Sequence, residues 1–234
     1  MGAIYRREIG AFFSSAIAYI FLAVFYFFSA FFFSMGCLYS STTDMSVVFS
    51  SMFMVILFLI PILTMRLMSE EKKQKTEQGL LTAPVSLTEI VLGKYLSALT
   101  LYTLGIVIFF VYALILAYFG KVSWTMILSN CLALFLLGGA FIAVAMFVSA
   151  LTENQIVSAI AGMFSLLLLY LLDSVSSVVS WEWLSTLLTK LSFYTRYYEF
   201  TQGIFDLSSV LFYISVIVLF NFFTVRVFEK RRWS

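Results

Sequence analysis

The segment Ser69–Lys94, with the sequence SEEKKQKTEQGLLTAPVSLTEIVLGK, is the longest water-compatible run in the chain. It holds eight charged side chains: Glu70, Glu71, Lys72, Lys73, Lys75, Glu77, Glu89 and Lys94. The stretches on either side of it are almost entirely apolar. We therefore expect residues 69–90 to form a cytosolic loop between two membrane-spanning helices. The loop either docks a protein partner or is a solvated connection whose charges only set topology.

The composition is typical of a polytopic membrane protein. The 234 residues are 62% hydrophobic and 11% charged, and their mean hydropathy is +1.04. A soluble domain carries about 25% charged residues. A soluble fold of this length could not bury so much apolar surface.

Charged residues mark where the chain cannot cross the centre of a bilayer. Six stretches without charge are at least 19 residues long, and a spanning helix needs about 20 apolar residues. They predict one all-α transmembrane domain over residues 1–234, with six spans at 17–38, 46–68, 91–119, 125–151, 156–172 and 208–228.

The distribution of Lys and Arg predicts the orientation of these spans. If residues 69–90 face the cytosol, eleven basic residues lie on the inner side, and only three lie outside: Lys121, Lys190 and Arg196. We therefore expect both termini in the cytosol.

Residues 1–15 predict a helix that lies at the membrane interface. Ile4, Ile9 and Phe12 belong to an apolar arc, and Arg6 and Arg7 lie opposite to it. Glu8 interrupts the apolar arc. The alternative is that the two arginines only set the topology of the first span.

Residues 173–206 form the longest outer segment. Aromatic side chains favour the headgroup level, and this segment is rich in them: Trp181, Trp183, Phe193, Tyr194, Tyr197 and Tyr198. We expect short helices that lie at the outer leaflet or dip into it. They either contact substrate or form an aromatic belt without such contact.

Local signals predict caps and a bend. Ser86-Leu87-Thr88-Glu89 and Thr152-Glu153-Asn154-Gln155 both match the capping box, with Ser86 and Thr152 as the caps. Pro61 predicts a kink in the second span, which serves packing or acts as a hinge. Gly138 and Gly139 allow close helix approach, either inside the chain or at a dimer seam.

The sequence lacks the residues of common active sites. It contains no His, which removes the commonest metal ligand and general base. No P-loop motif occurs, and there is no basic and aromatic stripe for nucleic acid. Cys37 and Cys131 lie in apolar runs and are expected to be buried. We therefore expect no enzyme activity, metal or cofactor in this chain, and no nucleic-acid partner.

Two stretches carry a resemblance to a known family. The run EEKKQKTEQGLLTAPVSLTEIVLGK, from Glu70 to Lys94, resembles the inner loop of ABC-type-2 exporter permeases. The run FYTRYYEFTQGIFDLSSVLFY, from Phe193, and TVRVFEKRRW, which ends at Trp233, look like the permeases of the gliding-motility and nitrous-oxide-reductase-maturation exporters. With the six spans, the resemblance covers essentially the whole chain.

The resemblance implies a permease subunit in the cytoplasmic membrane of a prokaryote. Two ATPase subunits, which carry ATP and Mg, would bind from the cytosol, and a second permease would complete a homo- or heterodimer. The loop would hold a coupling helix, the first helix would connect at the interface, and the outer segment would form re-entrant helices. By the matched motif, the ATPase contacts would be Glu70, Glu71, Lys72, Thr76, Glu77, Leu80 and Leu81. The residues that shape the loop would be Gly79, Pro84, Ser86, Glu89, Gly93 and Lys94.

The sequence thus favours an ATP-driven exporter that uses a separate ATPase. The aromatic spans suit a lipid-like or amphipathic substrate, although core packing explains them equally well. A membrane scaffold without transport is the alternative. A channel or secondary carrier is disfavoured because the spans contain almost no ionisable groups.

Overall fold

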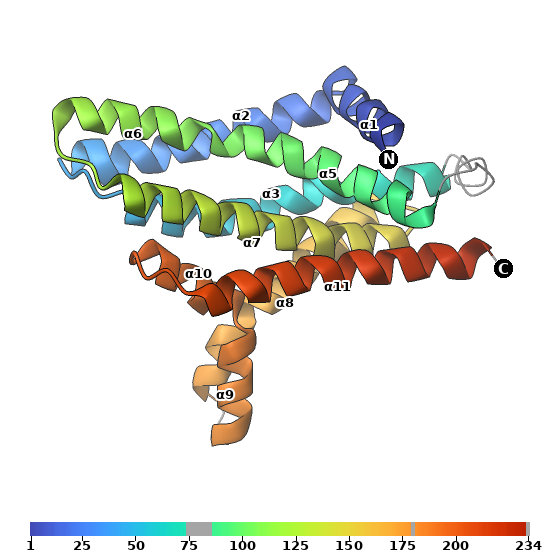
Figure 1. Ribbon diagram of the computed structural model, residues 1–234. Helices are drawn as coiled ribbons and strands as arrows, with labels where there is room; N and C mark the ends of the chain where they lie inside the picture. The colour runs from blue at the N-terminus through green and yellow to red at the C-terminus, as the bar shows by residue number, and fades with distance from the viewer. Residues whose placement is uncertain (74–85, 179–180, 233–234) are drawn as a thin grey trace.

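The computed structural model of the chain describes residues 1–73, 86–178 and 181–232. Every regular element in these residues is a helix (Figure 1). The elements are α1 (Gly2–Ser14), α2 (Ala16–Phe33), the π-helix η1 (Ser34–Tyr39), α3 (Ser46–Lys73), α5 (Leu87–Ile106), α6 (Ile108–Phe119), α7 (Trp124–Leu151), α8 (Gln155–Val178), α9 (Glu182–Leu191), α10 (Phe193–Thr201) and α11 (Leu207–Arg232).

Six helical segments among the described residues are long and apolar enough to cross a membrane, which confirms the predicted number. They are Ala16–Tyr39, Ser46–Lys72, Leu87–Phe119, Trp124–Leu151, Gln155–Ser176 and Leu207–Lys230. Ser69–Lys73, expected in the loop, continue α3 as a helix. Helix α5 begins at Leu87, directly after the predicted cap Ser86 and ahead of the expected span 91–119.

Helix α3 extends beyond its expected end because its last turns are supported by packing and by charge. Leu67, Met68 and Ser69 are buried against the bundle. Arg66 Nε donates a hydrogen bond to Glu70 Oε2 at 2.5 Å, one turn further along. Such i,i+4 ion pairs stabilise a helix. The polar residues at the start of the segment 69–90 therefore belong to a membrane helix.

Helix α7 is the centre of the bundle and packs against α3, α5, α8, α10 and α11. Over its most apolar 18 residues, 78% of the residues are buried, compared with 61% over the corresponding part of α3 and 22% over those of α8 and α11. The outer helices therefore present most of their apolar surface outward, as expected of helices in contact with lipid.

Gly138 and Gly162 serve packing within the chain. A Cβ atom on Gly138 would lie 2.2 Å from two ring atoms of Tyr102, so α7 has room there for no more than a hydrogen atom. A Cβ atom on Gly162 of α8 would lie 3.2 Å from Pro61 Cβ of α3. Pro61 stands inside a helix that continues past it, and its ring packs against α8.

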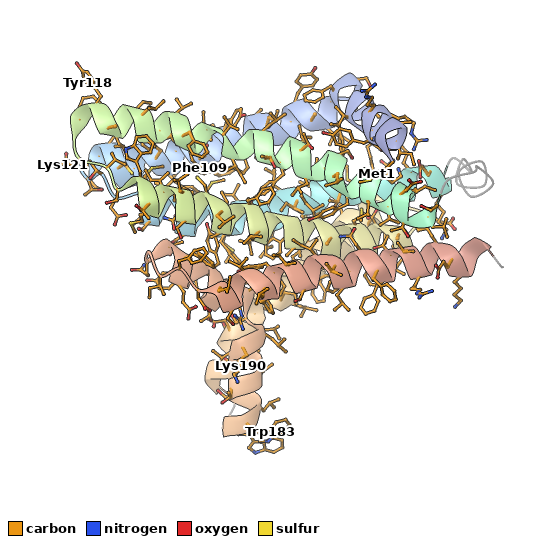
Figure 2. All side chains as sticks on the ribbon, viewed as in Figure 1. Met1, Phe109, Tyr118, Lys121, Trp183 and Lys190 are labelled. Carbon is orange, nitrogen blue, oxygen red and sulfur yellow. The ribbon has the colours of Figure 1, made fainter. Side chains whose placement is uncertain are left out.

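The aromatic residues of the outer segment divide into two groups. Phe193, Tyr197 and Phe200 on α10 are buried in the bundle, and the Tyr197 hydroxyl donates a hydrogen bond to the Phe49 carbonyl at 2.7 Å. Helix α10 therefore packs into the bundle, and its position relative to the membrane stays a prediction. Helix α9 projects sideways from the bundle, with Trp183 at its tip (Figures 1 and 2). Trp183 is 65% exposed.

One predicted cap is present and the other is not. Ser86 Oγ accepts a hydrogen bond from the Glu89 backbone N–H at 3.3 Å, which confirms Ser86 as the cap of α5. At the start of α8, Asn154 Oδ1 accepts from the Ile156 N–H at 2.9 Å. Asn154, which follows the predicted cap Thr152 by two residues, therefore caps α8, because the chain enters the helix only at Gln155.

Candidate functional site

Lys94 on α5 is the most deeply buried cation among the described residues. It is only 1% exposed. Its ammonium donates a hydrogen bond to the Leu67 carbonyl at 2.7 Å and to Glu8 Oε1 at 3.0 Å, and it lies 3.0 Å from Glu71 Oε1. Burying an ammonium group is costly unless oxygen atoms replace its water. Here those oxygens come from α1 and α3.

Arg7 closes a ring of alternating charges with Lys94 and the two carboxylates. Its Nη2 lies 2.6 Å from Glu8 Oε1 and 2.6 Å from Glu71 Oε1, so each of these carboxylate oxygens contacts both cations. The side chains of Glu8 and Glu71 are 12% and 13% exposed. We call these four residues, Arg7, Glu8, Glu71 and Lys94, the charge ring. Two cations and two carboxylates make it formally neutral.

The charge ring depends on a close approach of α1 and α5. A Cβ atom on Gly93 would lie 3.1 Å from Ile4 Cγ2, so a glycine beside Lys94 allows α1 to pack directly on α5. Tyr5 strengthens this contact, since its hydroxyl lies 3.0 Å from Thr100 Oγ1. Glu8, one turn beyond Ile4, then faces Lys94. The acidic residue that interrupts the apolar arc of α1 is thus explained by a cation across the interface.

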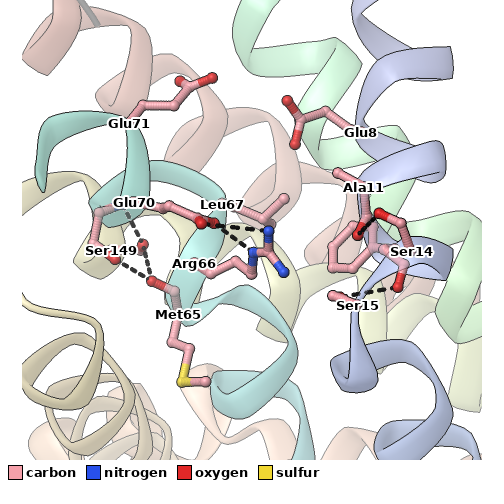
Figure 3. Close-up of polar contacts among 12 residues, drawn as sticks. Glu8, Ala11, Ser14, Ser15, Met65, Arg66, Leu67, Glu70, Glu71 and Ser149 are labelled. Atoms are coloured by element: carbon pink, nitrogen blue, oxygen red, sulfur yellow. Dashed lines mark hydrogen bonds and ion pairs between the residues drawn. The ribbon is translucent and has the colours of Figure 1, made fainter. Parts of the chain in front are cut away.

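A cavity of about 280 Å³ opens beside the ring, lined by charged and apolar residues of α1, α3 and α5. Arg66 and Glu70, which pair with each other on α3, also line this cavity. Figure 3 shows them on α3, with Glu8 on the facing helix α1. The cavity therefore has balanced charge and lies where three helices meet.

The pKa of Glu8 reflects this environment. Burial raises the pKa of its carboxyl, but the charge of Lys94 and the hydrogen bonds from Arg7 and Lys94 outweigh burial. The resulting pKa lies below the ordinary value of 4.5. Glu8 is therefore ionised at neutral pH, as the ring requires.

The end of α3 is also tied to α7 and to the turn that follows it. Ser149 Oγ on α7 donates to the Met65 carbonyl at 3.0 Å and accepts from the Ser69 N–H at 3.3 Å (Figure 3). Lys72 Nζ lies 2.8 Å from Glu153 Oε1 in the α7–α8 turn. The last turns of α3 thus contact α1, α5, α7 and the α7–α8 turn.

The predicted site residues fall into three groups. Glu71 and Lys94 lie in the charge ring, Glu70 lines the adjacent cavity, and Gly93 packs on α1. Lys72 contacts the α7–α8 turn, Ser86 and Glu89 form the start of α5, and Pro61 packs on α8. The remaining residues lie outside the described ones: Thr76, Glu77, Gly79, Leu80, Leu81 and Pro84.

Sequence reasoning did not assign Arg7, Glu8 or Glu153 to the site. Glu8 gave a signal, because a carboxylate within an apolar arc needs a partner, but nothing in the sequence identifies Lys94 as that partner. The described residues contain no group of three or more Cys, Asp and Glu side chains that could hold a metal ion. What the arrangement offers is a mechanical connection between helices.

Comparison with known proteins assigns a family. A family model described as a protein of unknown function (DUF2705) matches residues 35–234. No curated protein matches the chain. The match includes Glu71 and Lys94 and begins after α1, which supplies Arg7 and Glu8. Because it covers most of the sequence, the chain belongs to the DUF2705 family of proteins of unknown function.

Proposed function

We propose that this chain is the transmembrane permease subunit of an ATP-driven exporter of the ABC-2 type. A separate ATPase would bind at the segment between α3 and α5 and drive the bundle between two states. The aromatic spans would accommodate a lipid-like or amphipathic substrate. The proposal starts from the resemblance of Glu70–Lys94 to the coupling loop of such permeases.

The observation that carries the proposal is the set of contacts at the end of α3. A coupling segment is useful only if its displacement moves the membrane helices. Glu71 connects this end to α1 and α5, Ser69 connects it to α7, and Lys72 connects it to the α7–α8 turn. A force applied just beyond Lys73 would therefore reach three other helices and the α7–α8 turn, which is what a two-state membrane transporter needs.

The distribution of charge supports the orientation that the proposal needs. Helix α1, which carries Arg7, gathers at one end of the bundle with the C-terminal ends of α3 and α11, which carry Lys72 and Lys230, whereas Lys121 lies at the other end (Figures 1 and 2). By the positive-inside tendency, the first end faces the cytosol. In this orientation α1 lies along the cytosolic interface, and α9 and α10 belong to the outer side.

The test is to purify the whole chain in mild detergent from its native membrane and identify the proteins that come with it. We expect a P-loop ATPase that is lost when residues 74–85 are replaced by a Gly/Ser linker of equal length. This replacement leaves Ser69, Glu71 and Lys72 in place, so the bundle contacts are kept. The control is a Gly/Ser replacement of residues 120–123 at the opposite end, which should retain the ATPase.

The proposal would be contradicted if the chain came alone or with a protein that hydrolyses no ATP. It would also fail if both replacements lost the ATPase equally, because the effect would then not be specific to the loop. A partner without ATPase activity would favour a membrane scaffold.

A further inference from the structure

A groove of about 410 Å³ lies between the first turns of α5 and the last turns of α11. Its volume is within the range of small-ligand sites. Leu92 and Tyr95 of α5 and Val218 and Phe222 of α11 contribute to its walls. These side chains give the groove apolar walls along the two helices. An acyl chain could pack against such walls.

Asn221 is an uncompensated polar group in this apolar wall. It is only 6% exposed. Its Nδ2 donates to the Ile217 carbonyl at 2.8 Å, and its Oδ1 accepts no hydrogen bond from the described residues. A buried acceptor without a donor costs about 1–3 kcal/mol, and lipid supplies no water to replace the donor. A ligand that brings a hydroxyl to this point would satisfy it after a small side-chain movement.

Arg226 provides a cation in the same groove as Asn221. Its guanidinium carbon lies 4.7 Å from the centroid of the Phe222 ring, so the side chain reaches back one turn along α11. One of its nitrogens pairs with Glu229 at 2.5 Å, and a guanidinium has five N–H donors in all. The lining of one apolar groove therefore contains both a cation, Arg226, and an amide acceptor, Asn221.

The charge of the surrounding segment selects an anion. Lys230 is exposed next to Glu229, and the sequence continues with Arg231 and Arg232. Basic residues directly at the end of a membrane helix attract anionic lipid, each by about 1 kcal/mol. Glu229 offsets only one of these four cations.

We propose that this groove binds an anionic phospholipid of the surrounding bilayer, with a hydroxyl next to its phosphate. The phosphate contacts Arg226, the hydroxyl donates to Asn221 Oδ1, and an acyl chain lies along Leu92, Tyr95 and Val218. Phosphatidylglycerol has this chemistry. Phosphatidylcholine has neither the net negative charge nor the hydroxyl.

The experiment measures lipid binding by the purified whole chain with native mass spectrometry in a neutral detergent. Phosphatidylglycerol and phosphatidylcholine of the same acyl composition are the probes. We expect a saturable site for phosphatidylglycerol only. Arg226→Gln should weaken its binding about fivefold, the equivalent of one lost headgroup contact. Asn221→Leu should weaken it too, whereas Glu229→Gln should strengthen it.

The matched control is Lys190→Gln, which removes one cation from the exposed surface of α9, far from the groove (Figure 2). It should leave phosphatidylglycerol binding unchanged. Equal binding of the two lipids, or equal effects of Arg226→Gln and Lys190→Gln, would overturn the proposal. The Arg226 side chain is largely exposed. We therefore expect Arg226→Gln to leave the packing of the core unchanged. The assay needs no ATPase, so its outcome is independent of the exporter proposal.

Discussion

Among single residues, Lys94 shows most clearly how a charge is kept inside an apolar bundle. An isolated ammonium in such a place would shift towards its neutral form. Lys94 instead contacts two carboxylates and a carbonyl, each within 3.0 Å. The carboxylates in turn share Arg7. Removing one member of this set leaves the others without compensation, so the ring should behave as a unit.

Substitution of Lys94 by Met should destabilise the folded chain strongly. Breaking a buried ion pair costs about 3–5 kcal/mol, because the remaining charge stays buried without a partner. Glu8 and Glu71 would both lose the cation that lies 3.0 Å from them. The measurement is the thermal midpoint in detergent, followed by near-ultraviolet circular dichroism. Lys190→Met, on the exposed surface of α9, is the control and should change little.

A second variant separates loss of charge balance from loss of packing. In Lys94→Met with Glu8→Gln and Glu71→Gln, both carboxylates are neutral, so most of the lost stability should return. If the triple variant were no more stable than Lys94→Met alone, the charge ring would not be the reason for the effect.

The pH dependence of stability should reveal Glu8. Its pKa in the folded chain lies below the ordinary value of 4.5. A lowered pKa means that the ionised form is favoured by folding, so the contribution is complete above pH 4.5 and declines as the pH falls through the folded-state pKa. The wild-type chain should therefore be more stable than Glu8→Gln at neutral pH, and the difference should shrink below pH 4.5. Thermal midpoints measured across this range provide the comparison, and a constant difference would contradict the assignment.

The site could be predicted only in part from these residues. The polar stretch from Ser69 to Lys94 pointed to the correct region, because charges between apolar runs must leave the lipid or find partners. It did not show that Glu71 faces inward, since a helix that carries charges on several sides does not reveal which of them packs. The inward direction of Glu71 appears only when α1, α3 and α5 come together and place Arg7 and Lys94 beside it.

At the scale of helices, close packing depends on positions without a side chain. Gly138 lets α7 approach Tyr102 of α5, a fully buried ring whose hydroxyl donates to the Leu134 carbonyl at 2.7 Å. Gly138 was compatible with both internal packing and a dimer seam. Because Gly138 faces Tyr102 of the same chain, it serves internal packing.

Gly138→Ala should destabilise the α5–α7 contact. The new methyl group would overlap the Tyr102 ring, and overpacking of this kind costs about 1–3 kcal/mol. The thermal midpoint should fall accordingly. Gly10→Ala is the matched control, because a Cβ atom there would have no neighbour within 4 Å, and alanine favours a helix. Equal midpoints for the two variants would refute the packing role.

Two neighbouring positions test the cap of α8. Asn154→Ala removes the acceptor for the Ile156 N–H and should cost about 1 kcal/mol. Thr152→Val should be neutral, since Thr152 Oγ1 makes no hydrogen bond to the described residues. The measurement is again the thermal midpoint. If Thr152→Val lowered the thermal midpoint more than Asn154→Ala, Thr152 would be the cap after all.

The α8 cap also shows why helix ends are hard to predict. Thr152 and Gln155 match the capping box, but Asn154 is an equally good cap, and Glu153 between them pairs with Lys72 of α3 at 2.8 Å. A local sequence pattern cannot include a contact with a residue some eighty positions away.

At the scale of the whole molecule, the sequence predicted the number of spans because apolar length decides it. It did not predict their arrangement. Helix α7 is apolar along its whole length, so no stripe in its sequence distinguishes a centre from a periphery. The same holds for the outer segment, where Tyr197 is buried and Trp183 is exposed although both are aromatic. Burial there depends on α10 folding back against Phe49 of α3.

The orientation of the molecule can be tested with two surface residues at its opposite ends. Cys37 and Cys131 are both buried, so they are first replaced by alanine to give a background without thiols. Lys121→Cys and Lys230→Cys then each introduce one thiol, and both positions are exposed. In intact cells a membrane-impermeant maleimide should label Lys121→Cys fully and Lys230→Cys only after lysis, if the end that carries most basic residues faces the cytosol, as proposed above. Labelling of Lys230→Cys in intact cells, with Lys121→Cys protected, would invert the orientation. It would also remove the exporter proposal, since no cytosolic ATPase could then reach the end of α3.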